Sequence, residues 1–176
     1  MGSVVEQKLG LKAIFRDHAA TWTSRTGTDG ASDRRRAVLW FFGVPSAPAA
    51  ILLVVHVHLQ SIGQILSGVS VFTALLFGLL ILMFNTGVTL RKDAAAITNA
   101  HGLRQLISDI RANATWAIIV GFTLAMLLVI AAATTATDES TPWGFTPPVA
   151  WLFVHLGLTL MAILRRLRTA FNYITR

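Results

Sequence analysis

The sequence predicts an all-α, polytopic integral membrane protein with four transmembrane helices, on the evidence of its composition, its apolar runs and its charge placement. Of 176 residues, 54% are apolar and only 13% are charged, with a mean hydropathy of +0.63. Ordinary soluble domains carry about twice that share of charged residues. A helix needs about 20 residues to cross roughly 30 Å of hydrocarbon. The uncharged runs that approach this length are 37–58, 62–84, 114–135 and 149–164.

The placement of Lys and Arg predicts the orientation of these spans. All 15 lie before the first span, between the second and third, or after the fourth, whereas 59–61 and 136–148 contain none. By the positive-inside rule, we expect both termini in the cytoplasm and the protein in the inner membrane of a bacterial cell. The residues expected to orient the spans are Arg34, Arg35, Arg36, Arg91, Lys92, Arg165, Arg166 and Arg168.

The net charge of +7 follows from the same residues. Basic side chains that flank membrane spans meet the anionic lipids of the inner leaflet. The polar segments lack the interleaved aromatic and basic residues that stack on bases. Membrane lipids, including anionic inner-leaflet lipids, are therefore expected partners, and nucleic acid is not.

The first 33 residues are predicted to form a cytoplasmic segment that precedes a membrane domain over 34–176. Between about residues 4 and 21, several apolar side chains and His18 share one helical side, which is typical of a short helix lying on a membrane surface. Residues 24–33 are rich in Gly, Ser, Thr and Asp, which favours a flexible linker.

The first span contains two prolines, Pro45 and Pro48. A proline has no backbone N–H, so a continuous helix leaves the carbonyls of Phe41 and Val44 without their usual donors. We expect a kink here. Inside a membrane a neighbouring group or water must bond to such carbonyls, and packing against a neighbour is the favoured interpretation.

The second span carries small residues at spacings of four, a pattern that lets another helix backbone approach closely. The spacing fits either another span of the same chain or another copy, and a packing face for homo-oligomers is the interpretation we favour. The residues of this face are Gly63, Ser67, Ser70, Ala74 and Gly78. Asn85 to Gly87 are expected to end the helix, because Asn and Gly favour helix C-termini.

A cytoplasmic helical extension is predicted over 93–113, with a break near Gly102. From Leu103 the apolar period continues without interruption into the third span, which predicts one helix from about Leu103 to Thr134 that projects roughly 15 Å beyond the membrane. The fourth span is expected to continue in the same way past Arg165. The apolar faces of these two extensions are too narrow to be buried alone, so each is expected to meet the other helix, the inner-leaflet surface, another copy or a cytoplasmic protein. The residues expected to contact a partner are Leu103, Leu106, Ile107 and Ile110.

Enzyme chemistry is not expected. The spans contain no Asp or Glu, so a carboxylate proton relay or an intramembrane aspartyl protease lacks its working groups. The chain has no cysteine, and it carries neither a nucleophile elbow nor a phosphate-binding or HExxH-type motif.

Three histidines carry an alternative hypothesis. His56 and His58 lie near the outer end of the first span, and His155 lies in the outer half of the fourth. Two such histidines are able to hold haem b or a transition metal between helices. The favoured interpretation is that they bond to neighbouring helices instead, so no cofactor is expected.

These patterns favour a non-enzymatic membrane protein that homo-oligomerises and couples the inner membrane to a cytoplasmic partner or trigger. By analogy alone, the chain is comparable to the small multi-span proteins that serve as membrane effectors or sensors of bacterial defence or toxin systems. One alternative is a pore or channel-forming protein, although no continuous polar stripe lines a span. The other is a haem or metal-binding electron-transfer subunit.

Overall fold

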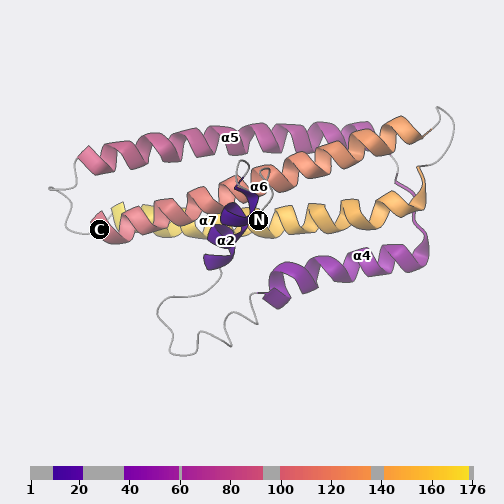
Figure 1. Ribbon diagram of the computed structural model, residues 1–176, viewed down its shortest axis with the longest axis horizontal. Coiled ribbons are helices and arrows are strands. Elements are labelled where there is room, and N and C mark those ends of the chain that lie inside the picture. The colour runs from indigo at the N-terminus through magenta and orange to yellow at the C-terminus, as the bar shows by residue number, and fades with distance from the viewer. Residues whose placement is uncertain (1–9, 22–37, 60, 93–99, 136–140, 175–176) are drawn as a thin grey trace, which may run out of the picture.

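The computed structural model describes residues 10–21, 38–59, 61–92, 100–135 and 141–174, and every regular element in those ranges is a helix. The predicted all-α class is therefore confirmed. Three long helices form the bundle: α5 (Ile62–Lys92), α6 (Ala100–Thr134) and α7 (Thr146–Ile174). They run side by side along the length of the molecule (Figure 1).

Three stretches are long and apolar enough to cross a membrane: Ile62–Thr89, Gln105–Thr134 and Trp143–Thr169. They coincide with the second, third and fourth predicted spans. A membrane protein is therefore plausible on the structure as well as on the sequence.

The first predicted span is shorter in the structure. It consists of a π-helical turn, η1 (Leu39–Gly43), followed by α4 (Val44–Val55), which packs against α7. The irregularity expected from the prolines takes the form of this π turn directly before Pro45. Pro45 then stands in the first turn of α4. Because the helical turn of η1 precedes it, its missing N–H still leaves the carbonyl of Phe41 without the usual helical donor. The helix ends at His56, which adopts a left-handed conformation with φ 54°.

A short helix, α2 (Leu11–Ala20), lies across the middle of the bundle and packs against α6 (Figure 1). It confirms the C-terminal part of the predicted N-terminal helix, while residues 4–9 and the predicted linker lie outside the described residues. Helix α2 contacts α6 close to residues 113–116, where the charged part of α6 gives way to its apolar part.

Two predicted helix boundaries are wrong, and tertiary packing explains one of them. α5 continues through Asn85 and Gly87 to Lys92. A Cβ built on Gly87 would lie 3.9 Å from the side chain of Ile107, so this end of α5 rests against α6. Nor does Gly102 break α6, which already begins at Ala100. The continuous third helix and the extension of the fourth past Arg165 are both confirmed.

The core of the bundle follows one face of α6. Its fully buried apolar side chains recur at spacings of three, four or seven residues, as a packed helix face requires. They are Ile110, Ala114, Ala117, Leu124, Leu128 and Ala131.

The burial of Ile110 corrects its assignment as a partner contact. Its side chain has no exposed surface, because the chain's own helices cover it. Leu106 and Ile107 are half-buried, and the side chain of Leu103 lies outside the described residues. The apolar period correctly predicts one continuous helix face on α6. At Ile110, however, this face packs against helices of the same chain.

Candidate functional site

His18 of α2 is buried at the point where α2 meets α6. Its side chain is fully inaccessible, and its Nδ1–H donates to Oδ1 of Asn113 over 2.7 Å. The imidazole ring stacks on Trp116, with ring centroids 5.3 Å apart and an angle of 19° between the rings. Phe15, one turn earlier, packs edge-on against the same indole. These contacts fix the apolar side of α2 on α6.

The C-terminus of α2 is held by a cation from α7. The Arg166 guanidinium donates to the carbonyl oxygen of Thr21, and its Nε lies 4.0 Å from a carboxylate oxygen of Asp109. The hydroxyl of Thr21 lies 2.6 Å from the carbonyl of His18 and 3.0 Å from Oδ1 of Asn113. A cation at a helix C-terminus is favoured by the helix dipole. Arg166, predicted to face lipid headgroups, therefore turns inward instead, whereas Arg165 and Arg168 are exposed.

His155 of α7 links the first span to the third. Its Nδ1–H donates to the carbonyl of Phe41 over 3.0 Å, and its Nε2 accepts the indole N–H of Trp116, also over 3.0 Å. An indole nitrogen only donates, so Nε2 must carry a lone pair and the ring must be neutral. The carbonyl of Phe41 is one of the two that the prolines deprive of a helical donor, and His155 supplies the replacement.

Aromatic rings surround His155 and join three helices and η1. The ring of Trp151 stacks on the imidazole at 5.0 Å with an angle of 7°, and the ring of His18 lies 6.4 Å away. We call this group the aromatic cluster. Its members are His18, Phe41, Phe42, Trp116, Trp151 and His155.

The surroundings of His18 disfavour its charged form. Burial away from water lowers the pKa of His18 from 6.5 to about 4. The hydrogen bond to Asn113 acts in the opposite direction, while His155 and Arg166 lower the pKa further. His18 is therefore neutral at pH 7 while α2 is docked.

The structure separates the three histidines of the cofactor hypothesis. His56 packs against the ring of Trp143 at 4.7 Å, and His58 Nδ1–H donates to the carbonyl of Thr141. Both contacts lie at the end of the bundle where α4 stops and α7 begins. His155 lies two turns further along α7, and a metal at its ring would have to displace one of its two hydrogen bonds. The haem or metal alternative remains a hypothesis.

The small residues of the predicted oligomer face are all exposed on α5. An added Cβ at Gly63 or Gly78 would meet nothing within 4 Å. The remaining members, Ser67, Ser70 and Ala74, are exposed as well. No described residue of the chain covers this face.

The sequence reasoning missed His18, Asn113 and Trp116 as one site. The sequence places His18 on the apolar side of its helix and Asn113 and Trp116 where the cytoplasmic extension joins the third span. A buried His opposite a buried Asn is the signal that was available. Nothing local connects two residues 95 positions apart, so the pairing itself emerged only from the fold.

Comparison with known proteins identifies no relative: no family model matches the chain, and neither the curated proteins nor the solved structures contain a match.

Replacing His155 with Leu is expected to destabilise the bundle, because it removes the partners of the Phe41 carbonyl and the Trp116 indole N–H. A buried polar group without a partner costs about 1–3 kcal/mol, and the half-burial of both residues places the loss near the lower end for each. Thermal unfolding in detergent, followed by helical circular dichroism, measures it. The H155L effect should shrink in a Trp116→Phe background, where the indole donor is already gone; equal effects in both backgrounds would contradict the role of this bond.

Proposed function

We propose that the chain is a non-enzymatic, four-span protein of the bacterial inner membrane that homo-oligomerises and couples the membrane to a cytoplasmic partner or trigger. The observation that carries the proposal is the outward-facing small-residue face of α5. The following contacts support its three parts: the fourth span, the assembly and the coupling element.

Contacts at one end of the bundle support four spans. The carbonyl of Val57 accepts the hydroxyl of Thr146, and the carbonyl of Thr141 accepts His58. The connection after α4 and the connection before α7 therefore meet, as they must if η1 and α4 form a span that runs beside α7. Neither connection contains Lys or Arg, which favours placing this end on the side opposite the cytoplasm.

The packing of α5 supports assembly. Within the chain α5 buries a narrow seam of Val69, Leu76 and Met83 against α6. The exposed face from Gly63 to Gly78 carries small side chains, which give lipid little contact but allow a second helix backbone to come close. A second copy of α5 fits such a face.

The docking of α2 supports coupling. α2 is a single short helix held through polar groups, and its site is not fully satisfied. Nδ2 of Asn113 and one terminal nitrogen of Arg166 are buried without a hydrogen-bond partner within the part of the chain that the structure describes. Each such group costs about 1–3 kcal/mol, which lowers the net free energy of α2 docking. A trigger therefore has only this small free energy to overcome when it displaces α2. Displacement would change the surroundings of Trp116 and His155 at once.

The test is the oligomer mass in lipid nanodiscs, measured by native mass spectrometry or mass photometry. The wild-type chain is expected as a multimer, and Gly78→Leu together with Ala74→Leu should shift it to the monomer. Gly157→Leu is the matched control, because Gly157 is exposed on α7 and an added Cβ there meets nothing within 4 Å. A monomeric wild-type protein, or equal effects of both changes, would overturn the proposed assembly.

Two further readouts on the same sample separate the alternatives. Dye release from liposomes on reconstitution would favour the pore, and a Soret absorption band in the purified protein would favour the haem subunit. The proposed function expects neither.

A further inference from the structure

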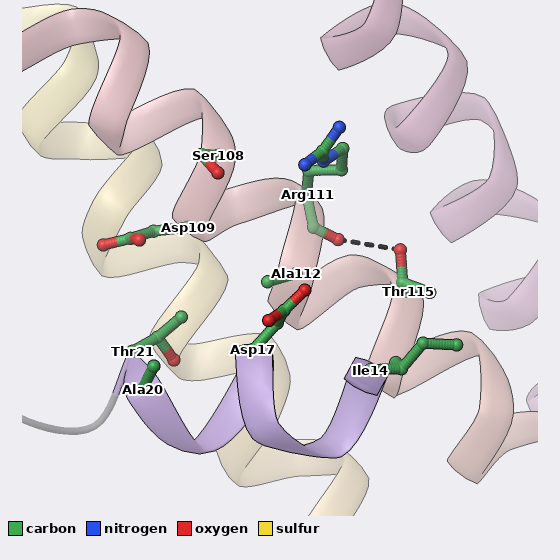
Figure 2. A pocket seen from close by; sticks show the side chains of 9 residues that line it. All are labelled: Ile14, Asp17, Ala20, Thr21, Ser108, Asp109, Arg111, Ala112 and Thr115. Atoms are coloured by element: carbon green, nitrogen blue, oxygen red, sulfur yellow. Dashed lines mark hydrogen bonds between the residues drawn. The ribbon is translucent and has the colours of Figure 1, made fainter. Parts of the chain in front are cut away.

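A cavity of about 340 Å³ lies between α2 and α6, on the charged side of the α2 contact. Figure 2 shows Asp17 reaching into it from α2 and Asp109 and Ser108 lining it from α6, with Arg111 at its rim and its guanidinium turned away from Asp17. The walls are completed by Ile14, Ala20, Thr21, Ala112 and Thr115. The cavity is not enclosed, so a ligand can enter it from the surroundings.

The charges of the lining fit a ligand with separated charges of opposite sign. The carboxylate of Asp17 suits a cation, and the guanidinium of Arg111, which is turned away from Asp17, suits an anion. The hydroxyl of Thr115 donates to the carbonyl of Arg111 at 2.9 Å, so its oxygen lone pairs are available as acceptors. These acceptors favour a primary ammonium, which donates three hydrogen bonds. A quaternary ammonium instead prefers aromatic faces, and the lining residues include none.

The same face of α6 continues from this cavity as an apolar track. Residues 111, 115, 118, 122, 126 and 129 follow the helical period and lie on one side of α6. Phe122 is 63% exposed, Met126 49% and Val129 47%. From Thr115 to Met126 the helix rises about 16 Å, close to half of a hydrocarbon core of roughly 30 Å. One molecule with a zwitterionic head and an acyl chain would therefore contact both parts of this face.

We propose that the cavity between α2 and α6 binds the phosphoethanolamine headgroup of a phospholipid. The ammonium binds Asp17, while Asp109 keeps its contact with Arg166. The phosphate meets Arg111, and an acyl chain lies along Phe122 and Met126. Because Asp17 belongs to α2 and the other groups to α6, the lipid joins the two helices. The proposal rests on the membrane location in the proposed function, but it does not depend on the number of subunits.

Lipid binding by the detergent-solubilised full chain tests the site. Native mass spectrometry with phosphatidylethanolamine, phosphatidylcholine and phosphatidylglycerol of identical acyl chains should show the first bound about tenfold more tightly than the other two. Asp17→Asn and Arg111→Gln should each remove most of this preference. Arg168→Gln is the matched control, because Arg168 is also an exposed arginine on a helix but lies outside the cavity. It should leave the preference unchanged.

A second arm separates a lipid from a free zwitterion. Soluble phosphoethanolamine is expected to compete only at concentrations far above those of the lipid, since it lacks the acyl chain. Phe122→Ala with Met126→Ala should weaken the lipid and leave phosphoethanolamine unaffected.

Three outcomes would overturn the proposal: equal binding of the ethanolamine and choline lipids, equal effects of R111Q and R168Q, or equal affinity for the lipid and for phosphoethanolamine. Each is distinct from failure of the proposed function, which would appear as a monomer in nanodiscs or as a protein that does not enter membranes. Circular dichroism of every variant confirms that the helices are retained before binding is compared.

Discussion

Gly121→Leu is expected to abolish the folded bundle, because α5 and α6 pack closely at Gly121. A Cβ built on Gly121 would lie 2.7 Å from the hydroxyl oxygen of Thr73, well inside van der Waals contact. That hydroxyl donates to the carbonyl of Val69 over 2.8 Å, so Thr73 cannot turn aside without losing its own bond. Overpacking by one side chain typically costs about 1–3 kcal/mol, and a leucine on this seam is expected to exceed that range.

A smaller change identifies the contact that causes the loss. Gly121→Ala gains up to about 1 kcal/mol of helix propensity, so a net destabilisation would show that the contact with Thr73 outweighs it. In a Thr73→Ala background the nearest remaining atom is the Cβ at 3.8 Å, an ordinary contact, and G121A should become neutral or stabilising. Unfolding in mixed detergent micelles measures both. If Gly157→Leu, at an open position on α7, destabilised as much as Gly121→Leu, the close approach would not be the cause.

Much of the architecture follows from periodicity and composition. Length and the absence of charge were enough to predict the spans at 62–84 and 114–135. The extensions of α6 and α7 were predicted from a helical apolar period that continues through the charged residues. Backbone chemistry also predicted a need for one specific tertiary contact. Because Pro45 has no N–H, the carbonyl of Phe41 needs another donor, and His155 provides it.

The errors share one physical origin, which is that local signals do not specify which neighbour a face will meet. The Asn-Thr-Gly sequence at 85–87 favours a helix end in isolation. In the fold, Gly87 packs on Ile107 of α6, and α5 continues past this contact to Lys92. Ile110 belongs to an apolar face in either interpretation, and the period does not distinguish the chain's own core from a partner's surface. His155 was considered with His56 and His58, whereas the fold places His18 beside it.

Acidification from pH 7 to pH 5 is expected to release α2 from the bundle. In the docked helix the pKa of His18 is about 4, against an ordinary value of 6.5, because burial disfavours the imidazolium. The neutral form favours docking, so this contribution is fully present above pH 6.5, weakens as the pH falls, and is lost through pH 4. At pH 5 the linkage corresponds to a roughly thirtyfold shift of the equilibrium towards the undocked state, or about 2 kcal/mol.

The groups around His18 determine how this test is designed. Electrostatic interactions with His155 and Arg166 of α7 lower the pKa of His18. Asp109 of α6 does not offset them at the imidazole, because it pairs with Arg166. Intrinsic amide exchange is slower at pH 5 than at pH 7, so undocking should appear as a fall in the protection of residues 10–21 after the intrinsic rate is corrected for. Because the chain has no cysteine, labels on Ala13→Cys and Ser108→Cys also report the separation directly.

His18→Gln provides the decisive comparison. Its amide can still donate to Oδ1 of Asn113, so α2 should remain docked at pH 7, but it does not titrate. The separation of the labels should then stay constant between pH 7 and pH 5, while the wild-type distance increases. If H18Q released α2 to the same extent on acidification, another group would control docking. A wild-type helix that stays docked at pH 5 would mean that His18 tolerates its proton inside the aromatic cluster, and that α2 is fixed rather than displaceable.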